Sequence, residues 1–292
     1  MNLPRILLFG RIGQVGWELR RTLAPMSRLV CVDFPEVDFT RPDSIRRWIQ
    51  DSAPDIIVNA AAYTAVDKAE KETALAMKIN GEAPGIMAEE ARARGALLVH
   101  YSTDYVFDGT KTSPYVEDDP PNPLSAYGRT KLAGDLAIQQ AGGRHLIFRL
   151  CWVYGARGGN FMLTMMRLAR EREQLRVVRD QFGCPTWSRL IAEATAQALL
   201  QVRTPDQAAA RSGLYHLCAS GETSWHGFAE AIIELMPAEG MKCRAVNAIA
   251  SAEYPTPARR PAYSAMSCAK LEQNFGLRLP DWRDSLQQVL ET

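Results

Sequence analysis

Two residues at helical spacing, Tyr127 and Lys131, carry the strongest chemical signal in the chain. A tyrosine and a lysine four positions apart lie on one helix face, with about 5–6 Å between their Cβ atoms. A nearby ammonium favours the phenolate, so the phenol, which normally titrates near pH ~10, should exchange a proton closer to neutrality. Thr103, at the expected end of a strand, could hydrogen-bond the same substrate oxygen. This set predicts chemistry on a carbonyl group and not hydrolysis.

A glycine loop stands near the start of the chain. The pattern G-x-x-G-x-x-G follows an apolar run at 5–9 and precedes an expected helix. Glycines let such a loop turn tightly, and they let backbone N–H groups approach a pyrophosphate at the positive end of the helix. A plain turn is the alternative, but the strand–loop–helix context favours a dinucleotide. The loop residues expected to bind it are Gly10, Arg11, Ile12, Gly13, Gln14, Val15 and Gly16.

Charged residues give opposite indications about which dinucleotide binds. Asp33, after the second expected strand, stands where a carboxylate would bind the adenosine ribose hydroxyls, which favours NADH. Arg11, inside the loop, could pair with the 2′-phosphate of NADPH. The sequence therefore leaves both NADPH and NADH open. Asp38 and Phe39 could contact the adenine, and a turn aspartate beside a core phenylalanine is an equal alternative.

These residues need a scaffold of alternating strands and helices. Short apolar runs bounded by turn residues predict strands, and longer periodic segments predict helices. Strands are expected at 5–9, 29–32, 55–58, 96–101 and 145–150, and helices at 15–23, 44–52, 67–94 and around Tyr127 and Lys131. The alternation predicts an α/β fold, a Rossmann-type doubly wound parallel sheet with right-handed crossovers.

Beyond Cys151 the alternation loosens. Strands are expected at 175–178 and 213–217, and helices at 163–173, 190–202, 225–235, 268–275 and 282–290. Some of these segments continue the sheet pattern and others do not. We therefore predict an NAD(P)-binding Rossmann domain at residues 1–150 and a smaller substrate-binding lobe at 151–292, interwoven with segments that return to the sheet. A ligand would lie between them, at the carboxyl ends of the strands.

Composition limits the class of protein. The 292 residues are 47% hydrophobic with a net charge of +1, which is no signature for nucleic acid or an anionic membrane. The longest apolar runs fall far short of the ~20 residues that a membrane span needs. Six isolated cysteines indicate reduced thiols, and the four histidines form no close-spaced metal set. We expect a cytoplasmic enzyme that binds neither nucleic acid nor membranes.

Several strings along the chain together resemble the dTDP-4-dehydrorhamnose reductase family, extended short-chain dehydrogenase/reductases of nucleotide-sugar metabolism. They are GRIGQVG at 10–16, NAAA at 59–62, VDKAE at 66–70, YSTDYVFDG at 101–109, YGRTK at 127–131, WVY at 152–154, GCPT at 183–186, GLYHL at 213–217 and YPTPARRP at 254–261. The family reduces the C4 keto group of dTDP-4-dehydro-β-L-rhamnose with NADPH or NADH, the last step of dTDP-rhamnose supply for bacterial polysaccharides. The resemblance implies a dTDP-sugar substrate here.

The resemblance also implies roles for residues. Thr103, Tyr127 and Lys131 match the catalytic set of the family, and Thr103, Asp104 and Trp152 match positions that contact the sugar. Beyond the glycine loop, the positions that match cofactor contacts are Asp33, Asp38, Phe39, Ala62, Tyr63, Thr64, Tyr127 and Lys131.

Two positions depart from the family pattern. Cys151 stands where relatives have a small hydroxyl residue before the tryptophan, so sugar contacts should differ in detail. Family members have also been described with magnesium bridging a dimer through glutamates. Glu18 matches one such position, but Arg189 stands where a second acid is expected, and a basic residue opposes cation binding. We therefore expect no metal site, with Glu18 as the magnesium candidate, and a homodimer stays open.

Four other functions share parts of the pattern. A sugar-nucleotide dehydratase needs a further acid, and such enzymes resemble Thr-Asp-Glu where this chain has Thr103-Asp104-Tyr105. Another nucleotide-sugar 4-ketoreductase or an epimerase is harder to exclude, since an epimerase runs the same hydride chemistry twice around tightly held NAD. The non-catalytic regulatory subunit of methionine adenosyltransferase resembles these reductases and uses the pocket for binding alone. The intact catalytic set favours an enzyme.

Overall fold

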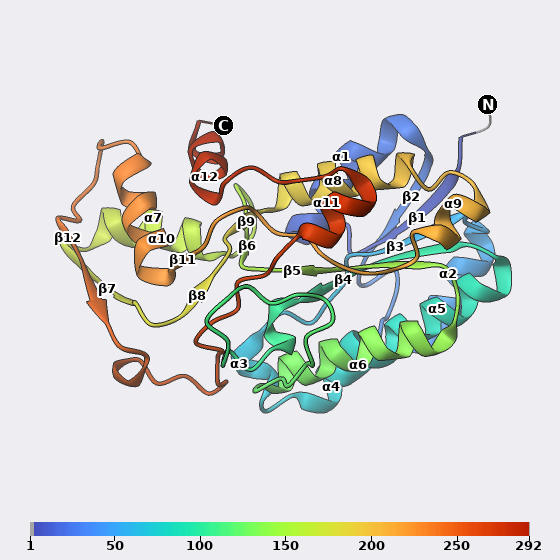
Figure 1. Ribbon diagram of the computed structural model, residues 1–292, viewed down its shortest axis with the longest axis horizontal. Helices are drawn as coiled ribbons and strands as arrows, with labels where there is room; N and C mark the ends of the chain where they lie inside the picture. Colours follow the sequence, from blue (N-terminus) through green and yellow to red (C-terminus); the bar gives the residue numbers. More distant parts are fainter. Residues whose placement is uncertain (1–2, 292) are drawn as a thin grey trace.

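The computed structural model describes residues 3–291, and a six-stranded sheet forms one half of it (Figure 1). The strand order is β10-β5-β4-β3-β1-β2, and every pairing is parallel. The strands are β1 (Arg5–Phe9), β2 (Arg28–Val32), β3 (Ile56–Asn59), β4 (Leu97–Thr103), β5 (His145–Leu150) and β10 (Gly213–His216). The prediction of an α/β fold with a Rossmann-type doubly wound parallel sheet is confirmed.

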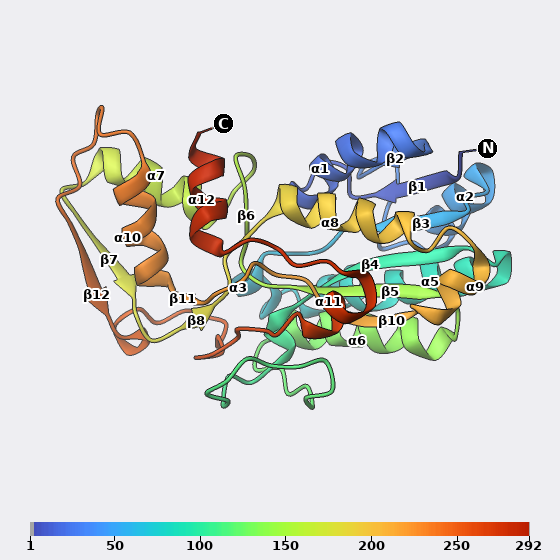
Figure 2. The same ribbon diagram turned by 45° about the horizontal axis from the view of Figure 1, so that its top comes forward.

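Helices cover both faces of the sheet, which is why the central strands are almost continuously apolar. One face carries α1 (Gln14–Leu23), α8 (Ser188–Leu200) and α11 (Ala269–Phe275); the other carries α2 (Pro42–Ser52), α5 (Ala83–Arg94) and α6 (Ala126–Ala141). In the turned view α1 and α8 run on the face opposite α6 (Figure 2). Residues distant in sequence, such as Leu19 and Ile191, therefore share one apolar core.

The segment predicted to be helical over 67–94 is helical over most of its length, with an interruption at residues 70–72. It forms α3 (Val66–Ala69), α4 (Thr73–Met77), a π-helical turn η2 (Lys78–Glu82) and α5. The turn aims the buried Asn80 at the loop after β3: its Oδ1 accepts from the backbone N of Tyr63 at 2.8 Å, and its Nδ2 donates to the Tyr63 carbonyl at 3.0 Å. Nδ2 also lies 3.2 Å from Thr130 Oγ1 on α6. Such turns are frequent at functional sites.

The other half of the molecule is assembled from several segments of the later chain. It contains α7 (Phe161–Glu171), α10 (Trp225–Leu235) and α12 (Trp282–Leu290) around an apolar core of its own. Small sheets pair β7 (Gln174–Val178) with β12 (Ala245–Ile249), β8 (Phe182–Gly183) with β11 (Thr223–Ser224), and β6 (Val153–Tyr154) with β9 (Thr186–Trp187). The remaining short helices are η1 (Ala24–Met26), η3 (Asp104–Val106), α9 (Pro205–Ala210) and η4 (Ser251–Glu253). The division at residue 150 stays a prediction, while α8, β10 and α11 do return to the sheet half.

A salt bridge joins two strings that lie far apart in the sequence. Asp67 of α3 accepts from the backbone N of Ala258 at 3.1 Å and from the Arg260 guanidinium at 2.9 Å. The proline-rich segment 254–261 is thereby held against α3.

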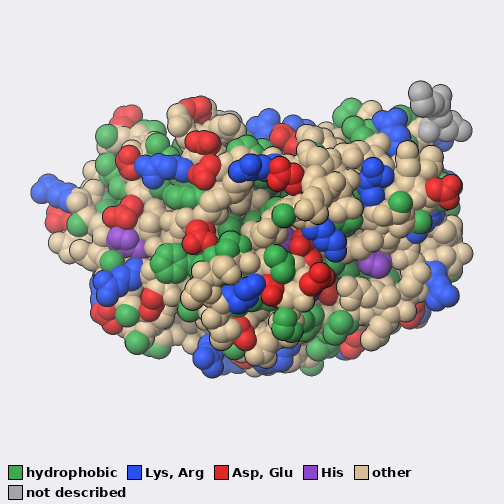
Figure 3. All heavy atoms as spheres, viewed as in Figure 1, with side chains coloured by type: hydrophobic (Ala, Val, Ile, Leu, Met, Phe, Trp, Pro, Cys, Tyr) green, Lys and Arg blue, Asp and Glu red, His purple; other side chains and the backbone are tan. Residues whose placement is uncertain are grey.

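The surface shows no separation of charge on the face in Figure 3, where basic and acidic side chains intermingle. Within residues 3–291, no helix combines the length and apolar character needed to cross a bilayer. The six cysteines, all within that range, are free thiols.

Candidate active site

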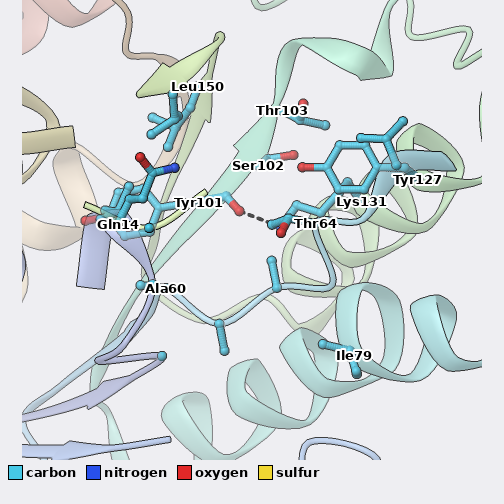
Figure 4. Close-up of a pocket in the computed structure, with 18 of the residues that line it drawn as sticks. Gln14, Ala60, Thr64, Ile79, Tyr101, Ser102, Thr103, Tyr127, Lys131 and Leu150 are labelled. Atoms are coloured by element: carbon cyan, nitrogen blue, oxygen red, sulfur yellow. Dashed lines mark hydrogen bonds between the residues drawn. The ribbon is translucent and has the colours of Figure 1, made fainter. Parts of the chain in front are cut away.

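A cavity of about 790 Å³ opens at the carboxyl ends of the sheet strands. The predicted site residues on its wall are Gly10, Ile12, Gly13, Gln14, Val15, Asp33, Asp38, Phe39, Ala62, Thr64, Thr103, Asp104, Tyr127, Lys131 and Trp152. In Figure 4, Thr103, Ser102 and Tyr127 lie together on one side of it, and Lys131 reaches toward Tyr101. Of the predicted set, Arg11, Gly16 and Tyr63 are not among the described wall residues.

The glycine loop is shaped by close backbone contacts. Gly10 has a φ of +84°, and a Cβ there would overlap the backbone of Ala60 and Ala61. A Cβ at Gly16 would overlap the carbonyl oxygen of Gly10, so Gly16 shapes the loop from outside the cavity. Gly13 caps α1 without a side-chain bond, which leaves the first N–H groups of the helix directed at the cavity. This cradle fits the pyrophosphate of a dinucleotide.

At the adenosine end, charged groups already have partners. Asp33 Oδ2 accepts from the backbone N of Ile12 at 2.9 Å, which closes the glycine loop. The Arg11 guanidinium donates to the Cys31 carbonyl at 2.8 Å and pairs with Glu36, Nη2 to Oε2, at 2.8 Å. No sequence pattern pointed to Glu36, which already pairs with the Arg11 guanidinium.

The two residues expected near the adenine are held by different means. Hydrogen bonds from the hydroxyl and backbone N of Thr40, at 2.7 and 2.9 Å, lower the pKa of Asp38. Phe39 is 9% exposed and packs edge-on against Phe9 with ring centroids 5.9 Å apart. Phe39 is thus both a core residue and part of the cavity wall.

The side chain of Tyr63 is held by Glu72. Its hydroxyl donates to Glu72 Oε2 at 2.6 Å, and its backbone is held by Asn80. The wall also contains Ala60 and Ala61, which follow β3, and Ser102, near the end of β4. Their position at the carboxyl ends of parallel strands could have indicated them. Trp225, at the start of α10, gave no comparable signal.

Local backbone contacts bring Thr103 and Tyr127 together. Ser125 Oγ caps α6 by accepting from the backbone N of Gly128 at 3.1 Å. A Cβ at Gly128 would overlap the carbonyl of Tyr105, so this glycine lets the start of α6 approach η3. Thr103, the last residue of β4, precedes η3 directly and hydrogen-bonds Tyr127.

The protonation states of Tyr127 and Lys131 differ from the sequence expectation. Burial raises the pKa of Tyr127 to about 12, a rise that the hydrogen bond with Thr103 only partly offsets. The predicted shift toward neutrality is therefore wrong for this site. The physical reason is desolvation, which disfavours the phenolate and also lowers the pKa of Lys131 to about 8.

Asp104, on the cavity wall, is held by a network of buried donors. It is 2% exposed, and burial raises its pKa to about 6 despite several donors. Thr103 Oγ1 donates to Oδ1 at 3.0 Å, while Ser264 Oγ and Cys151 Sγ donate to Oδ2 at 2.6 and 3.2 Å. Cys151 is not among the described wall residues. The difference from the family pattern at this position therefore affects the site through the hydrogen bond from Cys151 to Asp104.

Trp152 forms part of the wall on the side of the second lobe. It has a φ of +43°, which is rare for a residue with a side chain and persists only where the surroundings determine it. Its indole stacks on Trp225 with 3.5 Å between centroids and 6° between planes. A Cβ at Gly183 would overlap the Trp152 ring, so the glycine is required for this position.

Glu18 lies on α1, away from the cavity wall, in a cluster of ion pairs. Arg21 pairs with Glu18 at 3.1 Å and with Glu193 at 3.4 Å, and Arg189 pairs with Glu193 at 3.3 Å. In residues 3–291 no group of three or more histidine, cysteine or acidic side chains could hold a metal ion. The cluster adds no support to Glu18 as a magnesium ligand.

Comparison with known proteins identifies the family. The family model described as the RmlD substrate binding domain matches residues 4–292. Over 284 residues the chain is 51% identical to the dTDP-4-dehydrorhamnose reductase of Burkholderia thailandensis, covering 96% of this chain and 95% of that protein. The chain belongs to the dTDP-4-dehydrorhamnose reductase family.

Further members of this family support the assignment across nearly the whole chain. The dTDP-4-dehydrorhamnose reductase of Escherichia coli is 47% identical over 292 residues, which cover 98% of this chain and 96% of that protein. The crystal structure of the Bacillus anthracis dTDP-4-dehydrorhamnose reductase in complex with NADP has a TM-score of 0.89 at 33% identity, and the match covers 99% of this chain and 100% of that one.

Proposed function

We propose that the chain reduces the C4 keto group of dTDP-4-dehydro-β-L-rhamnose to give dTDP-L-rhamnose, with NADPH or NADH as hydride donor, in the cytoplasm. The observation that carries this proposal is the meeting of Thr103, Tyr127 and Lys131 with the glycine loop in one cavity. Relatives at 51% and 47% identity bear the name of this reductase. The product would supply rhamnose-containing polysaccharides.

The residues present fit a nicotinamide dinucleotide. The cradle at Gly10 and Gly13 and the uncapped start of α1 would hold the pyrophosphate, Asp33 the adenosine ribose, and Lys131 the nicotinamide ribose. When bound, the cofactor supplies a hydride to the ketone carbon. Ala62 and Thr64 line the passage across the sheet edge.

The chain's own residues would stabilise the oxygen that gains charge. Tyr127 keeps its proton, because its pKa is raised to about 12, and can give it to the ketone oxygen. Thr103 orients that oxygen from the end of β4. Donors placed in advance stabilise the developing charge, and a fixed geometry aligns the reacting carbons.

The sugar would lie between Asp104 and Trp152. Both residues border the cavity next to the catalytic set, and both are held rigidly, Asp104 by its donors and Trp152 by the stack on Trp225. In this arrangement residues 1–150 bind the cofactor and one side of the dTDP-sugar, and segments of 151–292 bind its other side.

A cofactor-oxidation assay tests the proposal. The dTDP-4-keto-6-deoxysugar, made in situ, is supplied with NADPH and NADH in parallel, and deuterium at the transferring C4 position of the cofactor should appear at C4 of the product sugar. Label in the solvent, or a product that keeps its keto group, would contradict the proposal. Turnover without net release of oxidised cofactor would indicate an epimerase instead.

A further inference from the structure

A chain of hydrogen bonds fixes the tautomer of the buried His100. The backbone N of Ala61 lies 3.2 Å from Asn59 Oδ1, and because a backbone N–H only donates, the amide oxygen must face it. The amide nitrogen Nδ2, a donor, then faces His100 Nδ1 at 3.0 Å. Nδ1 must accept. His100 is fully buried, and burial holds its pKa well below the usual value, so the ring is neutral and its one proton lies on Nε2.

The Nε2–H of His100 points at Lys131. Nε2 lies 3.3 Å from Lys131 Nζ, and Nζ donates to the carbonyl oxygen of Tyr101 at 2.5 Å (Figure 4). An ammonium has three donors and no lone pair, so one of its N–H groups would face the N–H of the imidazole, with no acceptor between them. A neutral amine has one lone pair and two donors. It can accept from His100, donate to Tyr101 and keep one N–H for the cavity.

We propose that His100 is a positioning residue that favours the neutral amine of Lys131, so that Lys131 exchanges its proton within the working pH range. The inference rests on the proposed reduction and deepens it, because it says what sets the charge of the lysine one helical turn after Tyr127. When the N–H bond of the ammonium breaks, the proton passes to solvent in the cavity, and the lone pair left on the amine accepts from His100 Nε2–H.

Other groups around Lys131 act in both directions. On α6, Asp135 favours the ammonium, but its carboxylate is shared with Arg149 of β5 at 3.3 Å, and Tyr127 is uncharged. Lys131 is 1% exposed, and burial dominates, which agrees with the pKa of about 8. With that pKa about nine-tenths of Lys131 is protonated at pH 7, yet the proton leaves far more readily than from an ordinary lysine near ~10.4.

His100→Gln tests the inference, because an amide can turn its oxygen to Lys131 and accept from an ammonium. The full chain is labelled with ¹³C at the lysine ε-carbon, the Lys131 signal is assigned with Lys131→Arg, and its pH midpoint is measured. We expect a midpoint near 8 in the natural chain and a rise of about one unit or more in His100→Gln. The alkaline fall of kcat should move upward with it, because activity that needs the ammonium is lost as pH rises through the Lys131 pKa.

His216→Gln is the matched control. His216 is also fully buried, on β10, and within residues 3–291 its Nε2 has no hydrogen-bond partner. Its replacement removes a buried imidazole that does not touch Lys131, so the midpoint should stay near 8. His100→Asn, which lacks the Nε2–H but keeps a polar group near Asn59, serves if His100→Gln does not fold and should also raise the midpoint.

The outcomes separate the inference from the proposed function. A midpoint near 10 in a natural chain that is an active reductase overturns the inference alone. An unchanged midpoint in the folded His100 variants overturns it as well. A midpoint near 8 that rises in the variants, in a chain without reductase activity, supports the inference about Lys131 and overturns the proposed reduction.

Discussion

The two ends of the cavity differ in how they control charge. At the adenosine end, the side chains of Arg11 and Glu36 are 33% and 42% exposed, and they form a direct ion pair in a solvated loop. At the catalytic end, Asp104 and Lys131 are at most 2% exposed. Solvent screening weakens the interactions between charges at the open end, whereas burial sets the protonation states at the closed end. Substitutions at the open end should therefore change the relative affinity for the two cofactors by small amounts. Substitutions at the closed end should change the rate of the reaction by large amounts.

The largest expected effect is at Tyr127. Tyr127→Phe should lower kcat by ~10²–10⁴ and leave cofactor affinity nearly unchanged, because the proton donor is lost while the binding surface is kept. Single-turnover rates and cofactor titration measure the two quantities separately. Retention of more than about a third of the natural kcat would show that another group donates the proton.

Asp104 should contribute a pH dependence to stability. Its folded pKa of about 6 lies above the usual value, so the folded chain binds more protons than the unfolded chain between these pH values. Its contribution to the free energy of unfolding is therefore present at low pH and lost as pH rises through 6, by about 2–3 kcal/mol. The difference between the natural chain and Asp104→Asn, followed by urea unfolding from pH 4 to 7, should show this loss. A difference independent of pH would mean that Asp104 is ionised without penalty.

The adenosine end should respond more weakly. Glu36→Gln should tighten NADPH relative to NADH by ~1 kcal/mol, since Arg11 is freed for the 2′-phosphate and the competing carboxylate is gone. Arg11→Ala should act in the opposite direction. Dissociation constants for both cofactors check this in one series. Equal effects on the two cofactors would show that neither side chain faces the 2′-phosphate.

The smallest effect is expected at Cys151. Cys151→Ser keeps a donor near Asp104 Oδ2, so kcat and KM should stay within about threefold of the natural values. Cys151→Val removes the donor and should raise the Asp104 pKa further. The pH at which the Asp104 contribution to the free energy of unfolding is lost should then move upward. Equal behaviour of the two variants would show that the thiol does not support Asp104.

The sheet could be predicted from the sequence, because strands buried on both faces appear as apolar runs. The expected strand over 96–101 and the observed β4 (Leu97–Thr103) illustrate this. The π-helical turn at 78–82 could not, since it is tied to bonds between Asn80 and the loop after β3. Neither helix propensity nor periodicity registers such contacts.

The same contrast holds within the site. The glycine loop and the pair Tyr127 and Lys131 are set by spacing along the chain, and so the sequence indicated them. Ser264 is separated from Asp104 by 160 positions, and His100 from Asn59 by 41, so only the fold reveals these contacts. The Tyr127 pKa was wrong in direction because burial cannot be judged from the spacing of two residues.

The π-helical turn at Lys78–Glu82 has a consequence for how this part of the chain can change over evolution. Each residue advances an α-helix by about 100°. Loss of one residue from this turn would rotate Asn80 away from Tyr63 and Thr130, and the loop after β3 and the helix that carries Tyr127 would lose their shared anchor. Substitutions on the exposed side of the turn are therefore tolerable, whereas a single deletion or insertion is not. The length of this segment is under stronger constraint than most of its residue types.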